Sequence, residues 1–203
     1  MKIICIGKNY HDHNREMNSK TPIAPVFFLK PDTSLLIRNR PFFLPNFSNQ
    51  LEHEVELLVK ICKVGKNISR KFTHTYYNEI GLGIDFTARD LQSECRNEGN
   101  PWEIAKGFDS SAAVSEFIHK KEFSDLTNLN FKLHLNGNQV QRGNSSDMIF
   151  VIDEIIEYLS KFLTLKTGDI IFTGTPSGVG KVAINDHLEG WLEDKKLLDF
   201  YIK

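Results

Sequence analysis

Two glutamates separated by one residue stand where a polar stretch becomes an apolar strand. Glu54-Val55-Glu56 opens the apolar run 55–61, and residues at i and i+2 of a strand point to the same face. Two carboxylates that lie close together repel each other, so a cation must compensate their charge. The pair predicts a site for a hard divalent cation, which prefers oxygen ligands. A solvated strand face is the alternative for such a pair taken alone.

Asp85 is the acidic residue that best completes such a site. It interrupts the apolar run 81–84, where a carboxylate is costly to bury. A turn or a helix cap is the alternative role for Asp85. Together with Glu54 and Glu56, it gives the three oxygen donors that we expect to form a metal site.

His13 and Glu16 are spaced so that they share one face of a helix. A carboxylate beside an imidazole raises its basicity and orients it as a general base. A chance pair on a surface helix is the alternative. His11 and His13 do not indicate zinc, because no Cys or His stands nearby at ligand spacing.

Composition and charge exclude several classes of protein. The chain has 203 residues, with 25 Lys+Arg against 26 Asp+Glu, and a nucleic-acid-binding protein would normally carry a basic excess. Its three cysteines are far apart, so no disulfide framework is expected and a reducing compartment fits. No stretch is apolar enough to cross a membrane. We therefore expect a cytoplasmic protein with neither nucleic-acid nor membrane partners.

One segment resembles a nucleotide-binding motif but does not match its requirements. The segment 174–181 resembles a phosphate-binding loop, but its spacing is one residue too long. Val182 also stands where that motif requires Ser or Thr.

Short strands dominate the expected secondary structure. Periodicity predicts one amphipathic helix over 147–162, and Asn136-Gly137 predicts a hairpin turn. The polar segment 9–19 can form only a short helix, and a Pro-rich loop is expected from Pro31 through Pro45. The expected strands are 2–7, 25–30, 55–61, 80–87, 131–135 and 170–172. The pattern predicts one β-rich α+β domain, residues 1–203.

Short motifs along nearly the whole chain resemble the fumarylacetoacetate hydrolase family, and their order along the chain is that of the family. They are Gly7-Lys8-Asn9-Tyr10, His13 with Glu16, Phe28-Leu29-Lys30-Pro31, His53-Glu54-Val55-Glu56-Leu57, Asp85 through Gln92, Trp102 with Ala105-Lys106-Gly107-Phe108, Asn136-Gly137, Met148-Ile149-Phe150, and Gly168 through Pro176. The chain looks most like the short branch with acylpyruvate hydrolase and oxaloacetate decarboxylase. Three segments carry this likeness: 13–17, 92–95 and 113–117.

The resemblance implies a fold and a set of functional residues. It implies a curled, mixed β-roll with few short helices, of the fumarylacetoacetase C-terminal type, usually assembled as a homodimer. It also implies that residues 9–19 form a mobile lid that orders when substrate binds. In its terms, His13, Glu16 and Lys106 are catalytic; Lys8, Arg89, Gln92 and Thr175 contact the substrate; and Mg²⁺ or Mn²⁺, with Ca²⁺ as a substitute, is held by Glu54, Glu56 and Asp85.

The expected activity is metal-dependent chemistry on carbon–carbon bonds of small 2-oxo acids. Three carboxylates and one divalent cation leave a net charge of −1, so Lys106, Arg89 and Lys8 are expected to attract the anionic substrate. A metal-stabilised enolate would serve both oxaloacetate decarboxylation and acylpyruvate hydrolysis. The alternatives are a 2-hydroxyhepta-2,4-diene-1,7-dioate isomerase, a 5-oxopent-3-ene-1,2,5-tricarboxylate decarboxylase, and a non-catalytic metal- or ligand-binding member.

Three positions depart from the family pattern. Lys8 stands where Arg is common, and Lys cannot make the same bidentate contact with a carboxylate. Asn185-Asp186 replaces a frequent Gly-Asp turn, and Ala112-Ala113 lacks a Pro found in many relatives. The first departure predicts an altered substrate preference, and the other two are structural.

Overall fold

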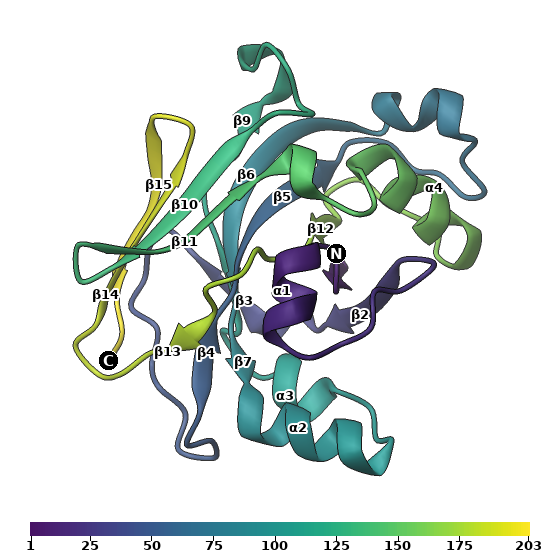
Figure 1. Cartoon of the computed structure of the whole chain (residues 1–203). Helices are drawn as coiled ribbons and strands as arrows, with labels where there is room; N and C mark the ends of the chain where they lie inside the picture. The colour runs from purple at the N-terminus through teal and green to yellow at the C-terminus, as the bar shows by residue number, and fades with distance from the viewer.

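Three sheets form the body of the protein, and the computed structural model describes all residues, 1–203. The largest sheet curls around the core, with helices only at its periphery (Figure 1). Its strands, in order of pairing, are β2 (Val26–Lys30), β1 (Ile3–Gly7), β12 (Ile170–Phe172), β5 (Val55–Ile61), β6 (Tyr77–Asp85), β8 (Ala112–Val114) and β3 (Leu35–Ile37), with β9 (Ile118–His119) also paired to β6.

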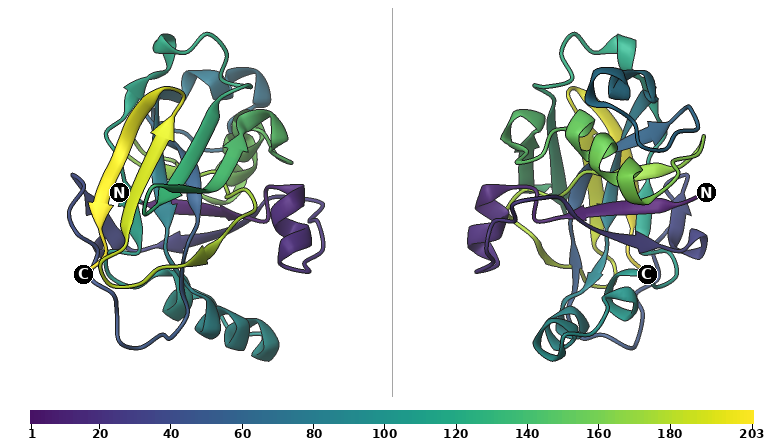
Figure 2. Two further views of the ribbon diagram at one scale, coloured as in Figure 1. Left: turned by 60° about the vertical axis from the view of Figure 1, so that its left-hand side comes forward. Right: turned by 90° about the vertical axis from the view of Figure 1, so that its right-hand side faces the viewer.

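The two smaller sheets flank this one. The first contains β11 (Asn138–Asn144), β10 (Asn130–Leu135), β14 (His187–Leu192) and β15 (Lys195–Tyr201), and the second contains β13 (Gly180–Lys181), β4 (Leu51–His53) and β7 (Thr87–Ala88). Figure 2 shows the hairpin β14–β15 crossing one side of the molecule, away from the helices.

The helices are few and short. The α-helices are α1 (His11–Glu16), α2 (Arg89–Glu98), α3 (Glu103–Lys106) and α4 (Ile152–Phe162). Short 3-10 helices are η1 (Asp32–Ser34), η2 (Arg70–Thr75), η3 (Lys120–Glu122) and η4 (Ser145–Asp147). No helix is both long and apolar enough to cross a lipid bilayer. The predicted α+β class and curled β-roll are confirmed.

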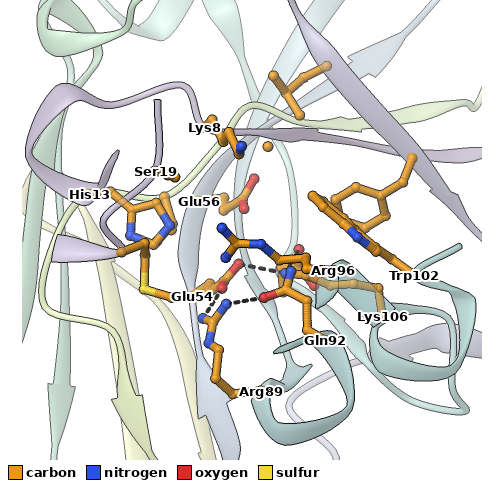
Figure 3. A pocket seen from close by; sticks show the side chains of 16 residues that line it. Lys8, His13, Ser19, Glu54, Glu56, Arg89, Gln92, Arg96, Trp102 and Lys106 are labelled. Carbon is orange, nitrogen blue, oxygen red and sulfur yellow. Dashed lines mark hydrogen bonds and ion pairs between the residues drawn. The ribbon is translucent and has the colours of Figure 1, made fainter. Parts of the chain in front are cut away.

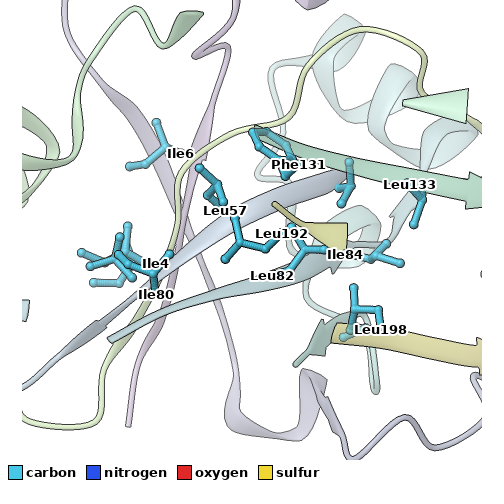
Figure 4. Close-up of a cluster of buried hydrophobic side chains, with 14 of the residues drawn as sticks. Ile4, Ile6, Leu57, Ile80, Leu82, Ile84, Phe131, Leu133, Leu192 and Leu198 are labelled. Atoms are coloured by element: carbon cyan, nitrogen blue, oxygen red, sulfur yellow. The ribbon is translucent and has the colours of Figure 1, made fainter. Parts of the chain in front are cut away.

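Alternation along β5 and β6 separates the core from the functional face. Leu57 and Leu82 belong to the main apolar cluster (Figure 4), whereas Leu58 belongs to a smaller cluster on the opposite face. Residues at even positions of β5 therefore share the face of Leu58, and Glu56 is one of them. Glu56 pairs with Gly83, and Asp85 lies two residues further along β6. The register thus brings the acidic residues of both strands to one face.

Gly83 is needed at this crossing because a side chain has no room there. A Cβ atom on Gly83 would lie 2.7 Å from the carbonyl oxygen of Ala113 and 2.8 Å from the ring of Phe172. We expect Gly83→Ala to destabilise the fold by about 1–3 kcal/mol through overpacking. Thermal melting should show a fall in Tm of roughly 3–10 °C. Gly180→Ala is the matched control, because its Cβ would meet only His53 at 3.4 Å; equal shifts for both variants would contradict the packing argument.

Most expected elements are present, with three differences. The predicted strand 80–87 ends at Asp85, and residues 87–88 pair with β4 instead. The helix predicted over 147–162 begins only at Ile152, because residues 145–147 form a 3-10 turn first. The expected Pro-rich loop contains β3, which pairs in parallel with β8.

Candidate active site

The three acidic residues predicted from the sequence lie together inside the protein. Glu54, Glu56 and Asp85 each offer an oxygen within 4.8 Å of the others. Their relative exposures are 5%, 2% and 1%, so the alternative of a solvated strand face is wrong. Asp85 is the last residue of β6 and caps no helix, because α2 has Ala88 as its N-cap. All three carboxylates line one pocket.

Lys106 bridges two of these carboxylates. Its Nζ atom donates to Glu54 Oε2 at 2.7 Å, to Asp85 Oδ2 at 2.8 Å and to Thr87 Oγ1 at 2.6 Å. The one-turn helix α3 buries Lys106 and directs it toward the carboxylates (Figure 3). Burial alone would lower the pKa of Lys106, but Asp85 and Glu54 outweigh it and raise that pKa. Lys106 is therefore a fixed positive charge.

Lys30 is a second buried cation at this site, and the sequence reasoning did not name it as functional. Its Nζ atom lies 2.8 Å from Asp85 Oδ1 as an ion pair, and it donates to Ser111 Oγ at 2.9 Å. Asp85 Oδ1 nevertheless accepts no hydrogen bond of good geometry. A lysine that ends the apolar run Val26–Leu29 was the signal, because it interrupts the pattern just as Asp85 does.

Arg89 joins the cluster from the first turn of α2. Its Nε atom donates to Glu52 Oε2 at 2.7 Å, and its terminal nitrogens bond Glu54 and the side-chain oxygen of Gln92. Arg89 and Gln92, the residues predicted to contact the substrate, both line the pocket and are hydrogen-bonded to each other. Glu52, which fixes Arg89, was not expected.

The buried charges do not balance. Four carboxylates, Glu52, Glu54, Glu56 and Asp85, meet three cations, Lys30, Arg89 and Lys106, and one negative charge is left over. A divalent cation would turn this excess into one positive charge. The predicted charge of −1 counted three carboxylates and the metal, with Lys106 and Arg89 as added cations; the structure adds Glu52 and Lys30 to that balance. The corrected balance suits an anionic substrate.

Glu56 carries the uncompensated charge. It has no salt bridge and accepts only the amide of Gly174, at 2.6 Å. Burial, together with Asp85 and Glu54, raises the pKa of Glu56 well above its usual range. Burial would also raise the pKa of Glu54, but Lys106 and Arg89 outweigh it and hold that pKa below its usual range. Clustered oxygen donors with excess negative charge fit a hard divalent cation.

His13 and Glu16 form the expected pair on α1. His13 Nδ1 lies 3.3 Å from Glu16 Oε2, and His13 is buried and lines the pocket. Glu16 does not line it; instead, its carboxylate accepts the amide of Gly178 at 3.0 Å. The loop that contains Gly178 therefore holds Glu16, which in turn contacts the imidazole.

The two remaining predicted residues differ in their freedom to bind. Lys8 lines the pocket and makes no salt bridge. Thr175 also lines it, but its hydroxyl donates to the carbonyl of Val55 at 2.9 Å and accepts from Gln141 at 2.9 Å. Thr175 as found here holds the loop to β5, so its hydroxyl is not free to donate to a carboxylate.

The family model described as fumarylacetoacetate (FAA) hydrolase C-terminal matches residues 2–203. The chain belongs to this family. Among relatives of the fumarylacetoacetate hydrolase family, the mitochondrial oxaloacetate tautomerase FAHD1 of Bos taurus is 42% identical over 201 residues, which is 99% of this chain and 91% of the relative. Family members with named activities are enzymes, and this chain is an enzyme of the same family.

Solved structures of the fumarylacetoacetate hydrolase family share this fold. A family member from Yersinia pestis superposes with a TM-score of 0.97 at 39% identity, covering 100% of this chain and 93% of the other. Fumarylpyruvate hydrolase from Pseudomonas aeruginosa, in complex with Mn²⁺ and pyruvate, has a TM-score of 0.94 at 30% identity, covering 100% and 89%. A 2-hydroxyhepta-2,4-diene-1,7-dioate isomerase from Mycobacterium marinum has a TM-score of 0.86 at 32% identity, covering 99% and 73%.

Several pocket residues of this family member escaped the sequence reasoning. They are Ile6, Gly7, Met17, Ser19, Phe28, Arg96 and Trp102. Met17 and Ser19 lie within the predicted lid, and Gly7, Phe28 and Trp102 belong to the motifs of the resemblance, but none of them was assigned a role. Arg96 had a clear signal, because it follows Gln92 by four residues and Arg89 by seven, which places all three on one helix face. Phe28 and Trp102 pack edge to face, with ring centroids 5.8 Å apart.

Proposed function

We propose that this protein is a divalent-metal-dependent enzyme of small 2-oxo acids, and that it interconverts the enol and keto forms of oxaloacetate. The observation that carries the proposal is the buried group of Glu54, Glu56 and Asp85, whose charge its neighbours do not fully compensate. The name of the bovine relative supports the substrate. The Mn²⁺ and pyruvate of the Pseudomonas structure support a divalent cation and a 2-oxo acid.

Glu54, Glu56 and Asp85 would hold Mg²⁺ or Mn²⁺, with Ca²⁺ as a substitute. Such a cation supplies Lewis-acid stabilisation of the negative charge that develops on a 2-oxo oxygen. Lys106 orients two of these three carboxylates for metal binding, because its hydrogen bonds fix Glu54 and Asp85 at defined positions. Its ammonium adds positive charge beside the reacting atoms.

His13 is the group that we propose moves the proton. Its Nδ1 atom is engaged by Glu16, so Nε2 is the ring nitrogen free to exchange a proton with C3 of the substrate. The contact between Glu16 and the amide of Gly178 holds this pair in place. We propose that residues 9–19, which carry both side chains, act as a lid over the bound substrate.

Carbon–carbon cleavage is the second candidate, supported by the fumarylpyruvate hydrolase among the solved structures. Loss of CO₂ from oxaloacetate leaves the enolate of pyruvate, whereas tautomerisation passes through the enolate of oxaloacetate itself. Both enolates place negative charge on the 2-oxo oxygen, so the same residues would stabilise either one. In an acylpyruvate, His13 would deprotonate a water that attacks the distal carbonyl, and pyruvate would leave as its enolate. The Mycobacterium structure supports dienedioate isomerisation as a third chemistry of this fold.

Four other expectations stay predictions. They are a single domain over residues 1–203, a homodimer, a cytoplasmic location, and the absence of nucleic-acid and membrane partners.

Two assays on one preparation test the proposed function. The decay of enol absorbance reports oxaloacetate tautomerisation, and pyruvate release from oxaloacetate and from acetylpyruvate reports cleavage, each with Mg²⁺ and with EDTA. We expect metal-dependent tautomerisation that Glu54→Ala reduces at least about 100-fold, after subtraction of the metal-only rate. Pyruvate release faster than tautomerisation would favour the second candidate. Turnover that survives both EDTA and Glu54→Ala would overturn the proposal.

A further inference from the structure

Two cations of the pocket are not used by the acidic cluster. Arg89 and Lys106 form salt bridges with its carboxylates, whereas Lys8 and Arg96 form none with any acidic residue. Burial and the charge of Arg96 both lower the pKa of Lys8, so the two side chains repel each other. Like charges held at one place without a counterion are typical of an anion-binding site.

The backbone of Lys8 is held in an unusual conformation. Its φ of 63° lies in the left-handed region, which costs a non-glycine residue about 1–2 kcal/mol. Asn14 fixes it by donating to the Lys8 carbonyl at 3.0 Å. The next residue, Asn9, is anchored by its own side chain, which donates to the carbonyl oxygens of Phe150 at 3.0 Å and Thr173 at 2.7 Å. These hydrogen bonds fix the backbone of Lys8 at the wall of the pocket.

Arg96 approaches the same space from α2. It is exposed, whereas Arg89 and Gln92 on the same helix face are buried, so it lies at the open end of the pocket. In the view of Figure 3, the Glu56 carboxylate lies between the ends of the Lys8 and Arg96 side chains. The two cations come from different segments of the chain and line the same pocket as the three carboxylates.

We propose that Lys8 and Arg96 bind a second carboxylate, so that this site selects dicarboxylic over monocarboxylic 2-oxo acids. The inference rests on the proposed function, in which the first carboxylate and the 2-oxo group lie at the acidic cluster. The metal-loaded cluster carries one positive charge, and Lys8 with Arg96 adds two. A dianion neutralises two of these three charges, whereas a monoanion neutralises one.

Equilibrium binding to the Mn²⁺-loaded protein tests the proposal with a matched pair of stable ligands. In 2-oxoglutarate a carboxylate takes the place of the terminal methyl group of 2-oxopentanoate. We expect wild type to bind 2-oxoglutarate at least about 10-fold more tightly, since a hydrogen bond to a charged group contributes about 1.5–3 kcal/mol. Lys8→Met and Arg96→Met should each remove most of this preference and leave 2-oxopentanoate within about two-fold. Arg40→Met, which removes an exposed arginine that makes no salt bridge and lies outside this pocket, is the control.

The outcomes separate this inference from the proposed function. If wild type shows no preference, or if both variants weaken both ligands equally, the second carboxylate site is wrong. A preference that depends on Lys8 and Arg96, in a protein that does not turn over oxaloacetate, would support the site and reject the proposed function. Titration of each variant with Mn²⁺ alone verifies that the metal site is intact.

Discussion

Metal-free Glu56→Gln is expected to melt at a higher temperature than metal-free wild type. Glu56 is buried beside Asp85 and Glu54 without a cation of its own, which disfavours its ionised form and raises its pKa, so the metal-free fold is destabilised by this carboxyl group as pH rises above its unfolded pKa. An amide keeps the shape, and its oxygen still accepts the amide of Gly174. The gain should be about 1–3 kcal/mol, or several degrees in Tm for a chain of this size. Addition of metal should reverse the order of the two proteins.

The stability advantage of metal-free Glu56→Gln over metal-free wild type should depend on pH with a definite sign. A carboxylate whose folded-state pKa is raised contributes stability that is fully present below its unfolded pKa, about 4.3, and is lost as pH rises through the folded value. The advantage of Glu56→Gln should therefore grow as pH rises from that range. Glu79→Gln is the control, because Glu79 is half-buried and paired with Lys60 at 2.9 Å.

Saturating Mn²⁺ provides the second half of this test. At 100 times the Kd it should stabilise wild type by about 2.7 kcal/mol, and this gain should be largely lost in Glu56→Gln. A Glu56→Gln protein that is less stable without metal, yet gains as much as wild type with metal, would contradict the charge balance described above.

Lys106→Met is expected to separate metal affinity from turnover. The substitution leaves Glu54 and Asp85 without their shared ammonium, so the metal-free protein should lose about 3–5 kcal/mol of stability. The cluster becomes more negative, and Mn²⁺ should therefore bind more tightly and restore much of that loss. Turnover should nevertheless fall about 100- to 1,000-fold, because a cation beside the developing enolate is gone.

Calorimetric titration with Mn²⁺, melting curves with EDTA and with Mn²⁺, and kcat together measure this separation. Lys60→Met is the control, because it breaks a half-exposed pair whose contribution is about 0–1 kcal/mol. Lys106→Met with kcat within ten-fold of wild type would show that the ammonium only stabilises the fold.

The metal-ligand candidates could be predicted from the sequence because they are charged residues next to or within apolar runs. Glu54 and Glu56 stand where one apolar strand begins, and Asp85 ends another. The same signal existed for Lys30, but its position directly before Pro31 led to its interpretation as the end of a strand. That Glu56 and Asp85, from distant segments, share one face of the sheet follows only from the register of β5 with β6.

The charge balance required the three-dimensional structure. Glu52 stands in β4, outside the apolar run, and nothing in its sequence context indicates that it fixes Arg89. The engagement of Thr175 by Val55 and Gln141 likewise depends on long-range packing. Arg96, in contrast, could have been found from helical spacing once Arg89 and Gln92 were chosen.

Direct titration of the chelator-treated protein with Mn²⁺, followed by electron paramagnetic resonance, tests the central claim that the buried carboxylates form a metal site. We predict one saturable Mn²⁺ per chain, lost or weakened at least about 100-fold in Glu54→Ala, and a change in the bound signal when pyruvate is added. Absence of saturable binding, or binding that is unchanged in Glu54→Ala, would contradict the assignment of Glu54, Glu56 and Asp85 as metal ligands.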